Sequence, residues 1–202
     1  SCEIQLATIG RLEVGTESQV DRAKSTKSFL MSFFEDQGLH DVEGIDTYNA
    51  CYGGTNALFS TVNWVQSSSW NGQLGVVICS DPAVHPQPEA LSGIGASSVA
   101  MLVGAQDGMA VAATRVSFIK HVWDFYRPIG WHNNDALIDI DVATSQYEEA
   151  LSWCQQQYST KLDIGDLLQE FQHVLFHSNA PYHAKRNLRL MCDSMYSKLS
   201  RE

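Results

Sequence analysis

Three things are scarce in this sequence: paired cysteines, long apolar runs and positive charge. The cysteines are widely spaced and form no Cys-x-x-Cys pair; the five of them are Cys2, Cys51, Cys79, Cys154 and Cys192. An odd, scattered set supports neither a zinc site nor a disulfide framework, so a reducing compartment fits best. No apolar run is long enough to cross a membrane, and the first residues lack a signal-peptide pattern.

Acidic residues outnumber basic ones: 23 Asp and Glu stand against 13 Lys and Arg, which gives a formal net charge of −10 and a pI near 5.0. Non-specific nucleic-acid binding needs a basic face, so we expect no nucleic-acid partner and, without an apolar span, no membrane partner. A small anionic ligand is compatible with this charge, because a few local cations suffice to bind it. Apolar residues are plentiful, at 44% of 202 residues, which is enough for a sizeable core.

The most informative stretch is 45–55, which reads Ile-Asp-Thr-Tyr-Asn-Ala-Cys-Tyr-Gly-Gly-Thr. Its extended start, its glycines and the amphipathic pattern after Thr55 predict a strand, a tight turn and a helix, with Cys51 at the N-terminus of the helix. A helix N-terminus favours an anion, so we expect the thiol to ionise more easily there. Without a Cβ, Gly53 and Gly54 would let a substrate carbonyl approach the backbone. Because free cysteines are often inert core residues, the residues alone leave both readings open.

Four blocks of sequence, in the right order, closely resemble 3-hydroxy-3-methylglutaryl-CoA (HMG-CoA) synthase of the eukaryotic type. They are Asn-Ala-Cys-Tyr-Gly-Gly-Thr at 49–55 with the tryptophan-containing segments at 62–64 and 67–72, Ile-Gly-Arg-Leu-Glu-Val-Gly-Thr-Glu at 9–17, Asp-Phe-Tyr-Arg-Pro at 124–128 and Leu-Phe-His-Ser at 175–178. The resemblance implies an α/β thiolase-like fold, layered α-β-α-β-α and incomplete in this chain. Residues 1–104 would finish the N-terminal half and 105–202 would begin the C-terminal half. We therefore expect an internal fragment of a larger synthase, the alternative being a true short relative.

The resemblance also implies three catalytic residues. Cys51 would be the nucleophile, Glu17 the general acid/base and His177 the residue that polarises or protonates a carbonyl oxygen. Taken alone, Glu17 could equally be a charge that favours a helix N-terminus, and a lone His is more often structural. Glu13 is the weaker acid/base candidate because it lies within a strand. No metal is expected, although His173 flanks His177, because no full ligand set is present.

Five further residues are candidates for substrate binding: Asp81, Asp124, Tyr126, Lys185 and Arg186. Four of them have a structural alternative. Asp81 could be a turn residue before Pro82, Tyr126 could be core, and Lys185 and Arg186 could lie on a solvated helix face. The segment 85–95 departs from the family, since His85 replaces a tyrosine and two prolines stiffen the loop. Family contacts therefore cannot be transferred to this loop.

The implied activity is that of an acyltransferase that condenses acetyl-CoA with acetoacetyl-CoA to give 3-hydroxy-3-methylglutaryl-CoA and CoA. The reaction passes through an acetyl-cysteine, needs no cofactor, and belongs to the mevalonate/isoprenoid or ketone-body pathway. A homodimer is expected, in the cytoplasm or in mitochondria. Two alternatives stay open: a polyketide β-branching synthase with a carrier-protein acceptor, and an inactive thiolase-fold fragment that serves as a binding module.

Local patterns predict the remaining elements. Strands are expected at 9–15, 75–80, 98–103, 115–123 and 173–176, and helices at 18–35, from 55, from 145, at 163–171 and at 182–200. Ser145 and Glu148 form a capping-box pattern at the start of the third predicted helix. Tyr147 and Cys154 lie on the apolar stripe of that helix, so Cys154 is expected in the core.

Overall fold

A computed structural model describes residues 4–83, 94–105, 108–128, 136–165, 167–178 and 181–199, without the side chains of 181 and 194–199. The chain divides into two compact units, one formed by Ser1–Val84 with Ile94–Val111 and the other by His85–Gly93 with Ala112–Glu202. The divergent loop at 85–93 lies outside the described residues. The assignment of 1–104 and 105–202 to two thiolase halves stays a prediction.

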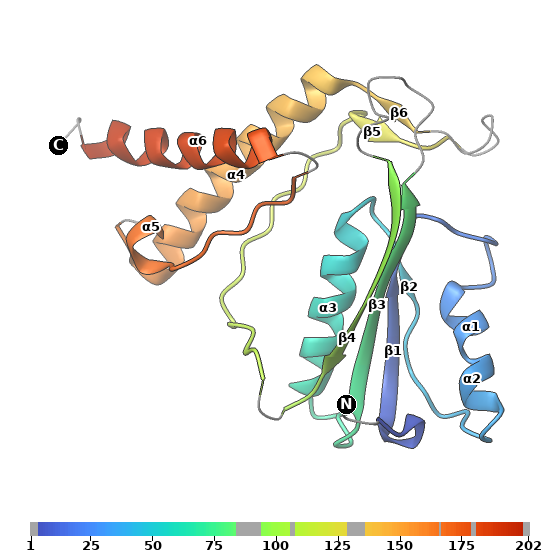
Figure 1. Ribbon diagram of the computed structural model, residues 1–202. Coiled ribbons are helices and arrows are strands. Elements are labelled where there is room, and N and C mark those ends of the chain that lie inside the picture. The colour runs from blue at the N-terminus through green and yellow to red at the C-terminus, as the bar shows by residue number, and fades with distance from the viewer. Residues whose placement is uncertain are drawn as a thin grey trace. The chain divides into compact units, whose positions relative to one another are not determined.

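A four-stranded sheet forms the centre of the first unit (Figure 1). Its strand order is β2-β1-β3-β4, with bounds Asp46–Thr47 (β2), Ile9–Gly15 (β1), Leu74–Ala83 (β3) and Gly95–Val103 (β4). β1 pairs in parallel with both β2 and β3, whereas β4 is antiparallel to β3. The strand at 9–15 is confirmed. β3 and β4 exceed their predicted lengths because they pair with each other from Gly75↔Val103 to Ala83↔Gly95.

Helices cover both faces of this sheet in Figure 1, α3 (Tyr52–Val65) on one face and α1 (Thr26–Leu30) with α2 (Ser32–Glu35) on the other. Alternation along β1 explains the arrangement, because successive side chains of a strand point to opposite faces. Leu12 belongs to the apolar cluster under α1 and α2, together with Phe34. Arg11 points the other way and hydrogen-bonds to Ser60 of α3.

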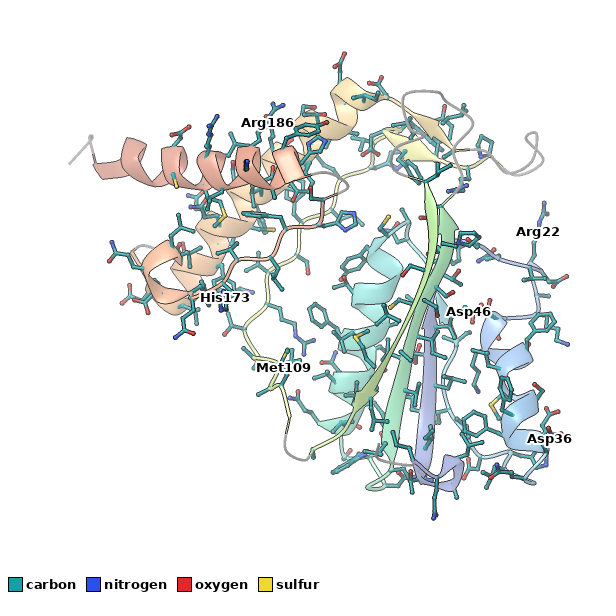
Figure 2. All side chains as sticks on the ribbon, viewed as in Figure 1. Arg22, Asp36, Asp46, Met109, His173 and Arg186 are labelled. Carbon is teal, nitrogen blue, oxygen red and sulfur yellow. The ribbon has the colours of Figure 1, made fainter. Side chains whose placement is uncertain are left out.

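The helix predicted at 18–35 is wrong in its first part, since residues 18–25 form no helix. Asp21 instead accepts hydrogen bonds from the N–H groups of Ala23 and Lys24, which closes a turn. α1 then begins under two caps: Ser25 accepts from Ser28 N–H, and Asp46 of β2 accepts from the N–H groups of the first helical turn (Figure 2). The sequence pattern could not show this cap, because it comes from a distant strand.

In the residues that the structure describes, the second unit contains a two-stranded sheet and three helices. The bounds are Phe125–Tyr126 (β5), Leu137–Ile138 (β6), Ile140–Leu162 (α4), Leu167–Glu170 (α5) and Pro181–Leu199 (α6); a short 3-10 turn, Leu6–Thr8, precedes β1 in the first unit. The predicted capping box is wrong. Asp139 caps α4 by accepting from Val142 N–H, and Ser145 lies inside the helix, where its hydroxyl donates to the Val142 carbonyl. α4 ends at Asp163, which adopts a left-handed conformation with φ 54°.

Two predicted strands are also wrong. Residues 115–123 form no strand, because they run beside α4: Lys161 donates to the Arg115 carbonyl, and the rings of Phe118 and Trp153 lie 5.6 Å apart. Residues 173–176 form no strand either, and Leu175 is 94% exposed. The final helix, predicted at 182–200, is confirmed as α6. Among the described residues, no helix is both long and apolar enough to cross a membrane.

Candidate active site

The carboxyl ends of the three parallel strands carry the candidate residues of the first unit. Glu17 follows β1, Cys51 follows β2, and Asp81 lies near the end of β3. In open α/β sheets, the residues just beyond these strand ends are where ligands bind. The sheet therefore brings together three residues that are far apart in the sequence.

Cys51 lies in a strained turn. Ala50, directly before it, has φ +44°, a left-handed conformation that a residue with a Cβ seldom adopts. Cys51 is the N-cap residue of α3, with φ −65°. The turn closes through Tyr52 N–H, which donates to the Asn49 carbonyl at 3.1 Å, and Gly53 N–H, which donates to the Ala50 carbonyl at 3.2 Å. The predicted order of strand, tight turn and helix is confirmed, and strain of this kind is concentrated at functional sites.

The Cys51 thiol faces a carboxylate. Its sulfur donates to Glu17 Oε1 at 3.7 Å, and Cys51 is exposed. Partial desolvation of the sulfur raises the thiol pKa, and the negative charges of Glu17 and Asp81 raise it further. The prediction that the Cys51 thiol ionises easily is therefore wrong, because its pKa is raised and not lowered. The physical reason is that the sulfur is partly desolvated and lies near two carboxylates, while the N–H groups of Tyr52 and Gly53 bond to turn carbonyls.

Asp81 holds the segment that carries Glu17. Its Oδ1 atom accepts from Thr16 Oγ1 at 2.8 Å, from Glu17 N–H at 2.9 Å and from Ser18 Oγ at 2.7 Å. A carboxylate with three donors on one oxygen fixes the backbone of its neighbour strongly. Thr16 and Ser18 were missed by sequence reasoning, although the Thr-Glu-Ser triplet after a buried strand is a usable signal for such a network.

The glycines after Cys51 serve packing. A Cβ on Gly53 would lie 2.5 Å from the Thr47 carbonyl oxygen, and one on Gly54 would lie 2.8 Å from Cys79 Sγ. Gly15 of β1 faces the same place, where a Cβ would meet the Gly54 Cα at 2.4 Å. The space at the Cβ positions of Gly53 and Gly54 is already filled by Thr47 and Cys79, so packing requires glycine here, and the approach of a substrate carbonyl to this backbone stays a prediction. These glycines let α3 lie directly on the strands and so place Cys51 at their ends.

Glu13 is excluded as an acid/base candidate by its surroundings. It is 1% exposed and pairs with Arg11 at 2.6 Å. The same guanidinium reaches Glu43 at 3.0 Å and lies over the Trp64 ring. A buried carboxylate held by a cation inside the strand–helix interface is structural.

His177 belongs to the second unit, in the segment between α5 and α6, and is exposed. Its carbonyl accepts a hydrogen bond from the Tyr147 hydroxyl of α4 at 3.2 Å. That hydroxyl also accepts from the Asn187 side chain of α6 at 3.1 Å. Sequence reasoning placed Tyr147 on the apolar stripe of its helix and missed both contacts; the signal was a tyrosine on an apolar face, whose hydroxyl needs a partner.

The other candidates also lie in the second unit. Asp124 accepts at its backbone carbonyl from Asp139 N–H at 2.8 Å, and the Tyr126 ring packs against Trp123 at 5.1 Å. Arg186, labelled in Figure 2, forms an ion pair with Glu148 of α4, and the neighbouring Lys185 is exposed. His173 lies exposed after α5 (Figure 2). Within the part of the chain that the structure describes, no group of three or more His, Cys, Asp or Glu could hold a metal ion.

Solved structures share this architecture. HMG-CoA synthase complexed with CoA superposes with a TM-score of 0.75 at 24% identity, over 94% of this chain and 48% of that one. MvaS in complex with 3-hydroxy-3-methylglutaryl coenzyme A superposes with a TM-score of 0.66 at 33% identity, over 78% of this chain and 38% of that one. The fold is therefore the thiolase-like α/β fold of condensing enzymes, present here in part.

Sequence comparison narrows this class. The family model for the N-terminal region of hydroxymethylglutaryl-coenzyme A synthase matches residues 1–108. The mitochondrial synthase of Homo sapiens is 38% identical over 96% of this chain and 40% of its own length. The cytoplasmic synthase of Gallus gallus is 42% identical over 86% of this chain and 35% of its own length. The erg13A synthase of Aspergillus fumigatus is 47% identical over 76% of this chain and 32% of its own length. The chain belongs to the hydroxymethylglutaryl-CoA synthase family, and it spans between a third and two fifths of the length of these relatives.

Proposed function

We propose that this protein is an acyltransferase that condenses acetyl-CoA with acetoacetyl-CoA and water to give 3-hydroxy-3-methylglutaryl-CoA and free CoA. The observation that carries the proposal is the contact of Cys51 Sγ with Glu17 Oε1, 3.7 Å apart, at the end of the parallel strands. Family membership supports it independently. The chemistry needs one nucleophile, one group that takes and returns protons, and one donor to a developing alkoxide.

The first half-reaction would use Cys51. Its sulfur attacks the acetyl carbonyl of acetyl-CoA, the thiol proton passes to the Glu17 carboxylate, and CoA leaves with a proton. Because the resting thiol has a raised pKa, attack and proton transfer would be coupled, with Glu17 as the acceptor. The product is a thioester between the acetyl group and Cys51.

The second half-reaction would use Glu17 again. The carboxylate removes a proton from the acetyl methyl group, and the resulting carbon nucleophile adds to the ketone of acetoacetyl-CoA. His177 is proposed to protonate the ketone oxygen as it gains charge. Water then hydrolyses the bond to Cys51, which releases the product and regenerates the thiol.

Substrate contacts are proposed for the remaining candidates. Asp81 would act through the backbone of Glu17, and Asp124 and Tyr126 would line the acyl site. The sequence ranks Arg186 above Lys185 as the contact to a CoA phosphate; because Arg186 pairs with Glu148, we propose Lys185 for this contact instead. A homodimer in the cytoplasm is proposed, in the mevalonate pathway; cytoplasmic and mitochondrial relatives are both similar to this chain.

Incubation with labelled acetyl-CoA, followed by peptide mass spectrometry, tests the proposal. We expect an acetyl adduct on the peptide that carries Cys51, and none in Cys51→Ala. Cys154→Ala is the matched control: it removes a half-buried thiol of α4 and should leave the adduct intact. An adduct that persists in Cys51→Ala would refute the nucleophile. A folded protein that forms no adduct would refute the enzyme and favour a binding module.

A further inference from the structure

Tyr147 connects three segments of the second unit. From α4, its hydroxyl donates to the His177 carbonyl at 3.2 Å, and it accepts from Asn187 Nδ2 of α6 at 3.1 Å. A hydroxyl has one proton and can also accept a hydrogen bond. Because the Asn187 amide donates to the Tyr147 oxygen, the Tyr147 proton is available for an acceptor. The Asn187 amide therefore directs the Tyr147 proton toward the His177 backbone.

Neighbouring contacts hold this arrangement in place. Asn187 is 4% exposed, and Gln155, two turns further along α4, donates to the Met191 carbonyl of α6 at 3.1 Å. An ion pair between Glu148 and Arg186 joins the same two helices next to Tyr147 and Asn187. Burial raises the pKa of Tyr147, so the phenol keeps its proton throughout the physiological range.

The backbone of the segment that carries His177 is irregular. Residues 171–178 contain no helix or strand, and Leu175 is 94% exposed. Regular secondary structure would fix a backbone carbonyl by its own ladder of hydrogen bonds. Here the Tyr147 hydroxyl of α4 donates a hydrogen bond to the carbonyl of the peptide unit between His177 and Ser178.

We propose that Tyr147 is a positioning residue for His177. The inference rests on the proposed function, in which His177 donates a proton to the acceptor ketone. Tyr147 touches no reacting atom in this scheme. It fixes the carbonyl of His177, which orients the Cα–Cβ bond and hence the imidazole, while Asn187 fixes the direction of the Tyr147 proton.

Tyr147→Phe tests the contact, because it removes the hydroxyl and keeps the ring. The chain contains one His-Ser pair, His177–Ser178. Labelling His carbonyl carbons with ¹³C and Ser nitrogens with ¹⁵N therefore isolates one amide resonance, which reports on the hydrogen bond to the His177 carbonyl. We expect this resonance to shift in Tyr147→Phe and to stay in place in Tyr158→Phe, a tyrosine of the same helix whose ring packs on Phe171.

Kinetics on the full-length gene product test the role. We expect Tyr147→Phe to lower kcat of condensation roughly fivefold to tenfold, the size set by one hydrogen bond that orients a reacting group. The rate of Cys51 acetylation should stay within about twofold of wild type, because that half-reaction does not use His177. Asn187→Asp should reproduce the defect, since a carboxylate would compete with the His177 carbonyl for the Tyr147 proton.

The outcomes separate the two proposals. A missing Cys51 adduct in wild type would defeat the proposed function, while the amide resonance would still test the Tyr147 contact. An unmoved resonance in Tyr147→Phe would overturn the positioning role. Equal losses of acetylation and condensation in Tyr147→Phe would also overturn it, because they would show a general structural effect. A condensation defect in Tyr147→Phe no larger than that in Tyr158→Phe would overturn it as well.

Discussion

Removing the negative charge of Glu17 should lower the pKa of the Cys51 thiol. The two atoms that interact, Cys51 Sγ and Glu17 Oε1, lie 3.7 Å apart, and two unit charges at that distance repel by about 1 kcal/mol at the dielectric constant of water. We use this limit because Cys51 is exposed. Glu17→Gln should therefore lower the thiol pKa, because it removes about 1 kcal/mol of repulsion between the carboxylate and the thiolate.

The assay is the pH profile of alkylation of Cys51 by iodoacetamide, followed on its own peptide by mass spectrometry. Below the pKa, the thiolate fraction should rise about sixfold, and the lower basicity of the sulfur should offset part of this gain. A net acceleration of about threefold at neutral pH is expected, with the midpoint of the profile displaced downward. Asp36→Asn is the charge-matched control, because Asp36 ends α2 on the opposite face of the sheet (Figure 2). A midpoint that stays in place or rises in Glu17→Gln would refute the electrostatic reasoning.

Three further substitutions follow from the packing around the site. Gly15→Ala should lower the free energy of unfolding by about 1–3 kcal/mol in urea titrations, because its Cβ would lie 2.4 Å from the Gly54 Cα. Arg11→Met should cost about 3–5 kcal/mol in the same measurement, because it leaves the carboxylate of Glu13, 1% exposed, without its cation. Asp81→Asn should slow acetylation of Cys51 about tenfold, because it weakens hydrogen bonds to a charged group that hold the catalytic segment.

For each of these three substitutions, one result would contradict the prediction. Gly95→Ala is the control for Gly15→Ala, since nothing lies within 4 Å of a Cβ at that position; equal stability losses at both sites would show that close packing is not the cause. Unchanged stability of Arg11→Met would show that Glu13 is not held by charge. Unchanged acetylation in Asp81→Asn would free Asp81 for the substrate contact predicted from the sequence.

The sequence was most informative where the structure depends on local pattern. The apolar strand before Glu17, the turn at Cys51 and the amphipathic helix after it are confirmed, because each follows from spacing within one segment. The family resemblance is confirmed as well, since the family model matches residues 1–108 and the human mitochondrial synthase is 38% identical. The catalytic and substrate-binding roles assigned through it stay predictions.

The wrong predictions share one cause, which is that groups distant in the sequence determine the local structure and the local pKa. Ser145 has the pattern of a helix cap, yet α4 starts earlier because Asp139 provides a better one. Residues 115–123 have the apolar character of a strand and instead follow the surface of α4. The helix alone predicts a lowered pKa for Cys51, whereas desolvation of the sulfur and then the charges of Glu17 and Asp81 raise it.

The raised thiol pKa has a consequence for the lifetime of the protein in an oxidising challenge. Peroxide attacks the thiolate, and the first product, a sulfenic acid, leads on to irreversible acids. Cys51 is exposed, yet partial desolvation and the charges of Glu17 and Asp81 raise its thiol pKa, which favours the protonated sulfur. The protein should therefore react more slowly with peroxide at Cys51 than a protein whose exposed cysteine is stored as thiolate.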